Sequence, residues 1–151
     1  MDFSKFNQAF DLNALKHDVQ EAAENGGNGN YREVPHGDYE VKIDKLELTA
    51  SKKGDPMVSC WFTILNGEFE KSKIFMNQVI TQGFQIHIMN TFLRSLDTGI
   101  EIQFDDFEQY ANLLYDVHEA VESQKLEFAL KYGENKGFNT FEITEVFEPG
   151  N

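Results

Sequence analysis

Apolar and polar residues alternate in the middle of the chain, and this alternation predicts β-strands. Tyr39, Val41 and Ile43 share one phase of the pattern, and the phase then slips so that Leu46 and Leu48 continue it. A slip of one residue within a long strand is what a β-bulge produces, and bulges bend strands toward a barrel. The sequence therefore predicts a long first strand that bends in its middle.

Two further strands follow the first one closely. The stretch Met57–Leu65 carries four alternating residues of one apolar face, namely Val58, Cys60, Phe62 and Ile64. Asn66-Gly67 is a strong signal for a two-residue hairpin turn. A third strand is expected from about Phe69 to Ile80. Three strands joined by short connections form a meander.

Helical spacing replaces the alternation over residues 82–123. A first helix is predicted from apolar residues at four-residue spacing, which are Phe84, Ile88, Phe92 and Leu96. Asp105-Asp106 then caps a second helix, because an aspartate at a helix start accepts a backbone N–H bond. Its apolar residues are Phe107, Tyr110, Leu113, Leu114, Val117 and Val121. Two strands end the chain: one alternates through Phe128 and Leu130, residues 133–137 turn, and Phe138–Phe147 returns.

Three strands, a two-helix insertion and two more strands is the element order of an OB-fold. This fold is a five-stranded Greek-key barrel of the mainly β (α+β) class, with a helix between strands 3 and 4. A generic α+β sandwich would give a similar pattern. We therefore expect an OB-fold domain over residues 31–151 with a helical insertion at 82–123.

Residues 1–30 are predicted to form an N-terminal helical arm and a linker. Asp11 caps a helix whose apolar face is Leu12, Leu15, Val19 and Ala22, and a run of Asn and Gly follows at residues 25–30. Phe3, Phe6 and Phe10 precede that helix. The sequence leaves open whether the helix packs on the barrel or binds a partner.

Aromatic and basic residues are expected to share the outer wall of the predicted barrel. If Phe62 faces the core, then Trp61 faces outward, because neighbouring residues of a strand point to opposite faces. Base stacking on a ring and phosphate contacts from lysines are what nonspecific strand binding needs. The candidate binding residues are Trp61, Phe75, Asn77, Lys52, Lys53, Lys71, Lys73 and Lys131. The alternative is that the rings pack in the core and the lysines serve solubility.

Charge restricts the kind of partner. The chain has 26 acidic and 13 basic residues, which gives a formal net charge of −13. This is the wrong overall sign for a protein that binds duplex DNA mainly through charge. The distribution is uneven, since the segment Glu101–Ser123 holds no Lys or Arg, whereas Lys42–Lys73 holds six lysines. An acidic side and a locally basic side are therefore expected on one domain.

Catalysis, metals and membranes find no support in the sequence. The four histidines lie in separate predicted elements without metal-ligand spacing, Cys60 alternates with core residues, and the glycine run lacks the Lys-Ser/Thr of a phosphate loop. No apolar run reaches the length of a membrane span, and the first residues do not resemble a signal peptide. We expect a soluble, intracellular protein that is not an enzyme and carries no cofactor.

Several stretches resemble a family of small phage proteins from replication and recombination modules, long catalogued only as a domain of unknown function. They are Phe10–Val19 with the Asn-Gly-Gly beyond it, Val34–Ile43 with the pattern Pro-x-Gly-x-Tyr-x-Val-x-Ile, and Lys53–Met57 with Lys-Gly-x-Pro-Met, leading to Lys73–Asn77. Members are described as single-stranded DNA-binding proteins with an OB-fold. The resemblance implies strand protection in the cytoplasm of an infected bacterium, beside a phage recombinase, annealing protein or helicase.

One departure concerns partner recruitment. Many strand-binding proteins end in an acidic tail with a terminal aromatic residue, and the segment Phe147–Asn151 has no such run. The acidic helix of residues 107–122 is the hypothetical substitute. The main alternative to strand binding is an acidic interaction factor that docks on a basic host or phage protein, as a DNA mimic or inhibitor. Self-association and the choice between DNA and RNA stay open.

Overall fold

The computed structural model describes residues 33–149. From Val34 onward these residues belong to one compact unit. The N-terminal helix, the aromatic arm, the linker at 25–30 and the resembling stretch Phe10–Val19 lie outside the described residues. The predictions made for them stay predictions.

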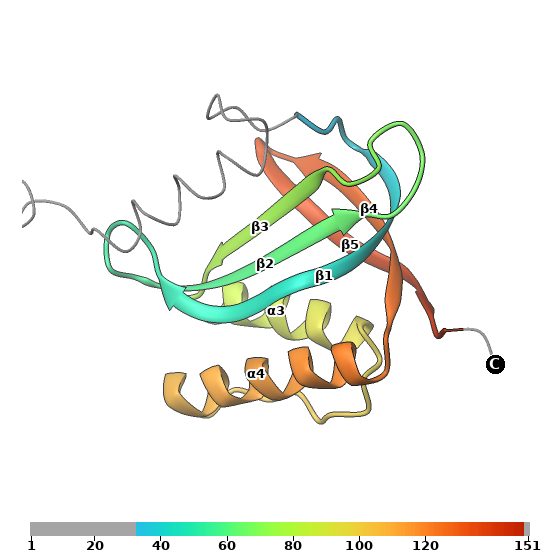
Figure 1. The fold of residues 1–151 in the computed structure, drawn as a ribbon. Helices are drawn as coiled ribbons and strands as arrows, with labels where there is room; N and C mark the ends of the chain where they lie inside the picture. Colours follow the sequence, from blue (N-terminus) through green and yellow to red (C-terminus); the bar gives the residue numbers. More distant parts are fainter. Residues whose placement is uncertain (1–32, 150–151) are drawn as a thin grey trace, which may run out of the picture. The chain divides into compact units, whose positions relative to one another are not determined.

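One antiparallel sheet and two helices make up the described part of the chain (Figure 1). Its strands lie in the order β3-β2-β1-β4-β5, and both helices fall between β3 and β4. The elements are β1 (Gly37–Ala50), β2 (Pro56–Ile64), β3 (Lys73–Val79), α3 (Gly83–Ser95), α4 (Phe107–Ser123), β4 (Glu127–Asn135) and β5 (Phe138–Phe147). The expected mainly β class, strand count and helical insertion are confirmed.

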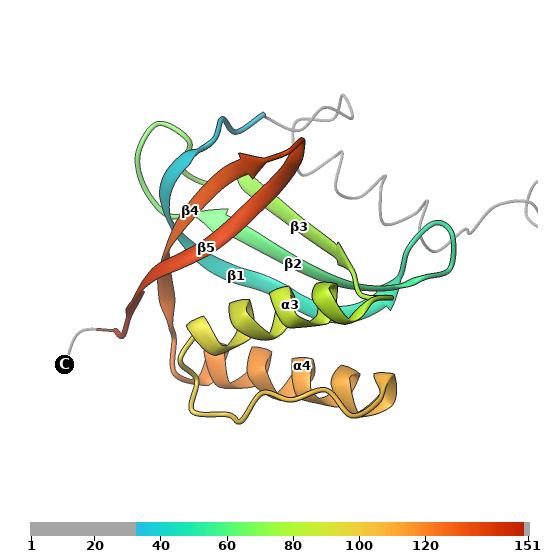
Figure 2. The same ribbon diagram turned by 180° about the vertical axis from the view of Figure 1, so that it is seen from behind.

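The sheet is open, so the closed barrel expected from the sequence is absent. Pairing joins β1 to β2 and β4, β2 to β3, and β4 to β5, and none joins β3 to β5 in the described residues. Figures 1 and 2 show the β4–β5 hairpin crossing over one side of β1–β3, with α3 and α4 below the sheet. The edges of β3 and β5 therefore remain two separate borders of a curled sheet.

The predicted bulge in the first strand is confirmed. Ile43 lies opposite Phe62 and Lys45 lies opposite Trp61, so Asp44 is the extra residue on β1. Because a bulge shifts the phase of the side chains by one residue, Val41 and Leu46 both point into the core. The bulge in β1 therefore lies where the alternation of apolar residues shifts by one position, after Ile43.

The hydrophobic core fills the space between the inner face of the sheet and the two helices. The four predicted core residues of β2 are confirmed, since Val58, Cys60, Phe62 and Ile64 are at most 1 % exposed. Phe62 packs edge-on against Phe92 of α3, with ring centroids 6.1 Å apart. Among the residues that the structure describes, no helix has the length and apolar character of a membrane span.

Burial makes Cys60 a reporter of unfolding. The loss of water around the thiol raises its pKa well above the usual value, and the nearby Asp44 carboxylate adds to that shift. Thiol reagents attack the thiolate. We expect native protein at pH 8 to react with a disulfide reagent only as fast as it opens, and urea-unfolded protein to react at once. Rapid labelling of native protein would show that Cys60 is accessible.

The predicted apolar face of the first helix is wrong in its first half. Phe84 and Ile88 of α3 are 61 % and 48 % exposed, and the helix instead buries Met89, Phe92 and Leu93. Four residues advance a helix by about 400°, so a strict four-residue spacing drifts by about 40° at each step. From Phe84 onward that drift carries the pattern around the helix. Only its later members reach the core.

The connection between β2 and β3 is longer than the predicted two-residue turn. It spans residues 65–72, and the Lys71 amide donates a hydrogen bond to the Ile64 carbonyl over 2.8 Å. Lys71 has a left-handed backbone, with φ of 71°. The third strand thus begins at Lys73 rather than near Phe69. Lys71 lies in a turn and not on the strand face that the sequence assigned to it.

The second helix begins as predicted, but its first aromatic residue is exposed. The Asp106 side chain accepts a hydrogen bond from the Gln109 amide over 2.7 Å and so caps α4. Tyr110 is buried, and its hydroxyl donates to Asn90 Oδ1 of α3 over 2.7 Å. Phe107, an apolar residue of the predicted helix, is 43 % exposed and packs edge-on against Phe104, with ring centroids 5.1 Å apart.

The last turn is tighter than predicted. Strand β4 continues to Asn135, and Lys136 and Gly137 both have positive φ, at 53° and 84°. Positive φ at both central residues is the mark of a type I′ hairpin turn. The tight turn leaves Phe138 at the tip of the hairpin with 76 % of its surface exposed.

Candidate functional site

An aromatic row crosses the face of β1–β3 that points away from the core, called here the outer face. Lys45 on β1 and Phe75 on β3 lie on either side of Trp61 on β2. The Trp61 and Phe75 ring centroids are 5.2 Å apart with planes at 89°, and Lys45 Nζ lies 4.3 Å from the Trp61 centroid. Both rings are half-buried. The row therefore offers π-surface with a positive charge beside it.

A charged row lies next to the aromatic row, where β1 bulges. The bulge residue Asp44 accepts hydrogen bonds from the Thr63 hydroxyl and from Lys73 Nζ, the latter over 3.0 Å. Lys42 Nζ lies 4.0 Å from the same carboxyl group. Lys73 is thus on the outer face, as the sequence predicts, but it is partly neutralised. A phosphate that approached Lys73 would compete with Asp44.

A polar row follows on the other side of the aromatic row. Ser59, which is 4 % exposed, donates its hydroxyl to Asn77 Oδ1 over 2.8 Å. This bond fixes the amide so that Asn77, an exposed residue, presents its NH₂ donors away from Ser59. Lys45 pairs with Glu47 over 3.1 Å at the β1 end of this row. Asn77 can therefore donate to a phosphate or a base edge.

A cleft of about 410 Å³ separates the open edges of β3 and β5. Phe75 and Asn77 line it from β3, and Phe138, Asn139 and Phe141 line it from β5. Phe75 therefore belongs to both the aromatic row and the cleft, so the two features are continuous. The three β5 residues were not among the residues predicted for the site. The signal that could have found them is an aromatic residue directly after a Lys-Gly hairpin turn.

The other predicted lysines lie outside this group of rows. Lys52 and Lys53 are exposed in the β1–β2 loop, and Lys71 is exposed in the turn before β3. Lys131 is exposed on β4 as predicted, but it lies opposite Asp38 of β1 and Glu142 of β5. That part of the sheet is therefore unfavourable for a phosphate.

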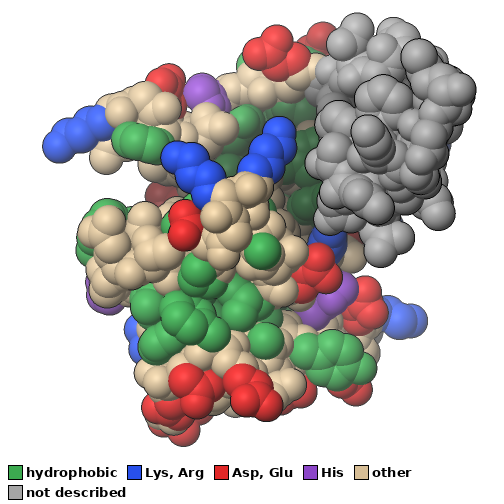
Figure 3. Space-filling model, turned by 90° about the vertical axis from the view of Figure 1, so that its left-hand side faces the viewer, with side chains coloured by type: hydrophobic (Ala, Val, Ile, Leu, Met, Phe, Trp, Pro, Cys, Tyr) green, Lys and Arg blue, Asp and Glu red, His purple; other side chains and the backbone are tan. Residues whose placement is uncertain are grey.

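In Figure 3, Lys and Arg side chains gather in the upper part of one face of the molecule, above an apolar patch and a group of acidic side chains.

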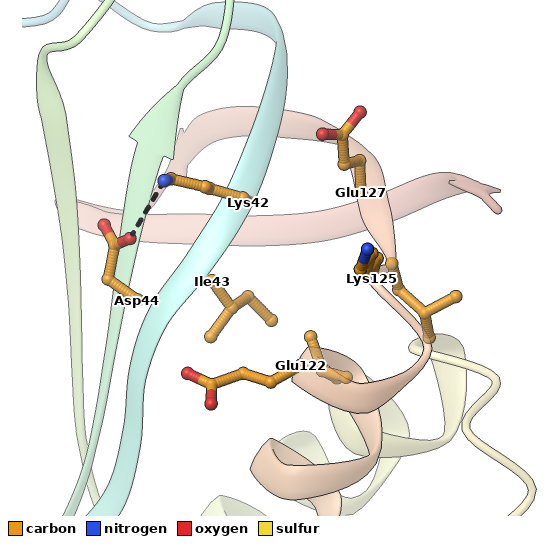
Figure 4. A pocket seen from close by; sticks show the side chains of 8 residues that line it. Lys42, Ile43, Asp44, Glu122, Lys125 and Glu127 are labelled. Carbon is orange, nitrogen blue, oxygen red and sulfur yellow. Dashed lines mark ion pairs between the residues drawn. The ribbon is translucent and has the colours of Figure 1, made fainter. Parts of the chain in front are cut away.

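A second pocket, of about 310 Å³, opens where the bulge of β1 meets the end of α4 (Figure 4). Lys42 and Lys125 line it together with three carboxylates, those of Asp44, Glu122 and Glu127. Figure 4 shows Lys42 and Asp44 pointing toward each other beside Ile43. Because acids outnumber bases here, this pocket does not suit an anion. The aromatic row and the cleft are the better candidates for a binding site.

Comparison with known proteins adds a family but no activity. A family model described as "Protein of unknown function (DUF669)" matches residues 13–149, which is nearly the whole chain. No curated protein matches the chain.

Proposed function

The chain belongs to the DUF669 family, and we propose that it binds single-stranded DNA without sequence preference through its outer face and the adjoining cleft. The observation that carries this proposal is the Trp61–Phe75 pair, half-buried on an open sheet beside the ammonium group of Lys45. We place this activity in phage replication and recombination, in the cytoplasm of an infected bacterium. A phage recombinase, annealing protein or helicase would work beside it.

We infer an OB-type architecture from the strand order, and this inference favours strand binding. OB-folds are five-stranded, partly open Greek-key barrels that bind oligonucleotides on strands 2 and 3 and on the loops beside them. The strand order and the position of the helices fit such a barrel left open between β3 and β5. The aromatic row lies on β2 and β3, and the β4–β5 turn carries Phe138. If the sheet is such an open barrel, the candidate surface corresponds to the part of the fold that OB proteins use.

The chemistry of the surface favours unpaired bases. A base that stacks on an aromatic side chain gains about 1–3 kcal/mol, and any base can do so because each has a π-face. Lys45, Lys73 and the Asn77 amide can meet phosphates alongside the rings. The bases of a duplex are stacked on each other and cannot reach the rings. With a net charge of −13, the protein gains little from the duplex backbone.

The experiment that tests this function compares strands in one assay. Fluorescence anisotropy of a labelled oligo-dT, followed by competition with unlabelled duplex, measures both affinities. We expect oligo-dT to bind at low salt, to dissociate as salt rises, and to resist competition by duplex. Equal competition by duplex would contradict stacking as the source of affinity. Absence of binding to oligo-dT would refute the function.

Removing the acid at the bulge is expected to strengthen binding. In the Asp44→Asn variant, Lys73 and Lys42 lose their carboxylate partner, so both can serve a phosphate. We expect oligo-dT affinity to rise by about three- to tenfold at low salt and this gain to vanish at high salt. The matched control is Glu119→Gln, which removes one negative charge from an exposed position of α4. An equal gain in both variants would indicate net charge rather than a local site.

A further inference from the structure

Exposed aromatic rings follow one side of α4, away from the core. Tyr115 is 67 % exposed and Phe107 is 43 % exposed. They lie eight residues apart with Ala111 midway, and residues four apart are neighbours on a helix surface. The helix meets the core with a different set of residues, including Tyr110, Leu114 and Val117. Phe107 packs edge-on against Phe104, with ring centroids 5.1 Å apart, and Tyr115 is the most exposed residue of the stripe. The stripe of Phe107, Ala111 and Tyr115 thus leaves apolar surface exposed on α4.

A groove of about 290 Å³ runs beside this stripe, between α4 and β1. Ala111, Tyr115 and His118 form its α4 wall, and residues 44–48 form its β1 wall. His118 Nε2 lies 3.1 Å from Glu122 Oε1, on the same side of the helix. The β1 wall itself carries Asp44 and Glu47 with Lys45 between them, so the groove joins apolar surface to a wall in which acids outnumber bases.

The charge of α4 and of the segment before it indicates the kind of partner that the groove would take. The segment from Asp97 to Gln124 contains eight acidic residues and no Lys or Arg. The acids are Asp97, Glu101, Asp105, Asp106, Glu108, Asp116, Glu119 and Glu122. Figure 3 shows acidic side chains gathered below an apolar patch in the lower part of the molecule. Such a surface repels nucleic acid and attracts a basic protein segment.

We propose that the α4–β1 groove docks an amphipathic, Lys/Arg-rich segment of a partner protein. The apolar side of that segment packs on Tyr115, Phe107 and the groove, in the mode by which an amphipathic helix lies in an apolar groove. Its basic residues pair with Glu108, Asp116 and Glu119 of α4. The inference goes beyond strand binding and does not depend on it. The groove adjoins the outer face along β1, so a docked partner would be held close to a bound strand.

A synthetic peptide tests the groove directly. The probe is a Leu/Lys peptide of about 18 residues, or about five helical turns, with its leucines at helical spacing. The control peptide has the same composition in an order that destroys the apolar side. We expect calorimetry at low salt to show that the amphipathic peptide binds and that Tyr115→Ala weakens it by about tenfold, as for an aromatic anchor of an interface. The combined variant Asp116→Asn with Glu119→Gln should also weaken it.

Matched variants separate docking in the groove from attraction by charge alone. Phe138→Ala removes an even more exposed ring, at the start of β5, and should leave peptide affinity unchanged. Tyr115→Ala should leave oligo-dT affinity unchanged. Equal binding of the two peptides would overturn the proposal, because it would show that the apolar side of the peptide contributes nothing. Equal affinity of the amphipathic peptide for wild type and for Tyr115→Ala would also overturn it. Self-association that Tyr115→Ala abolishes would make a second copy of this chain the occupant and would also overturn it.

Discussion

Replacing Trp61 with alanine is expected to weaken oligo-dT binding by about tenfold or more, which makes it the largest single effect on function. Each stacked base contributes about 1–3 kcal/mol, and a loss of 1.4 kcal/mol is about a tenfold loss of affinity. The variant also removes the ring against which Phe75 packs and over which Lys45 lies. Anisotropy of a labelled strand, which does not depend on tryptophan, measures the effect.

A conservative variant at the same position is the control. Trp61→Phe keeps an aromatic ring next to Phe75, and we expect its affinity to stay within about threefold of wild type, because stacking tolerates a change of ring. Circular dichroism should show that both variants keep the fold, since the side chain is only half-buried. Unchanged affinity in Trp61→Ala would remove the aromatic row from the binding site.

Replacing Phe62 with alanine is expected to give the largest loss of stability. Its side chain is completely buried, and it contacts both Phe92 of α3 and Phe141 of β5, with centroids 6.1 and 6.2 Å away. Since β5 has no pairing to β3, Phe62 is one of the contacts that hold this strand over the sheet. Phe→Ala in a core costs about 3–5 kcal/mol, against a total stability of about 5–15 kcal/mol.

Urea unfolding followed by circular dichroism measures this loss. The matched control is Phe138→Ala, which removes the same side chain from an exposed position and should change stability by less than about 0.5 kcal/mol. Similar losses in the two variants would contradict the assignment of Phe62 to the core. Reaction of Cys60 should also become faster in Phe62→Ala, because the native state opens more often.

The strands could be predicted from the sequence wherever one face of a strand is buried. The phase slip after Ile43 predicted the bulge, and the alternation through Val58 and Phe62 predicted which side of β2 packs inward. Because side chains alternate between the two faces of a strand, a buried face produces a regular alternation of apolar and polar residues. The two-helix insertion was readable for a similar reason, since Asp106 and the residues after it match a cap and a helical period.

Element ends and exposed apolar residues were less readable. Phe84, Ile88 and Phe107 are apolar, yet the structure leaves them exposed, because the angle at which a helix meets the sheet is decided by tertiary packing. Lys71 was assigned to a strand, yet its positive φ places it in a turn. A positive φ is uncommon for a lysine, so the residue type at this position does not predict it.

The candidate site was predicted in part. Alternation placed Trp61, Phe75 and Asn77 outward, and the register then brings Trp61 and Phe75 into contact. The pairing of Lys73 with Asp44 depends on the geometry of the bulge, which the sequence does not give. The cleft with Phe138 depends on how β5 crosses the sheet, since residues 75 and 138 are far apart in the chain. Long-range packing of this kind has no local signature.

The most direct test of strand binding uses the single tryptophan of the chain. Oligo-dT is titrated into the protein at low salt while Trp61 emission and the anisotropy of a labelled strand are followed together. Stacking of bases on the outer face predicts that emission is quenched in step with the anisotropy and that added salt reverses both. A strand that binds by anisotropy while Trp61 emission stays constant would contradict the proposed site, and no binding in either signal would contradict the function.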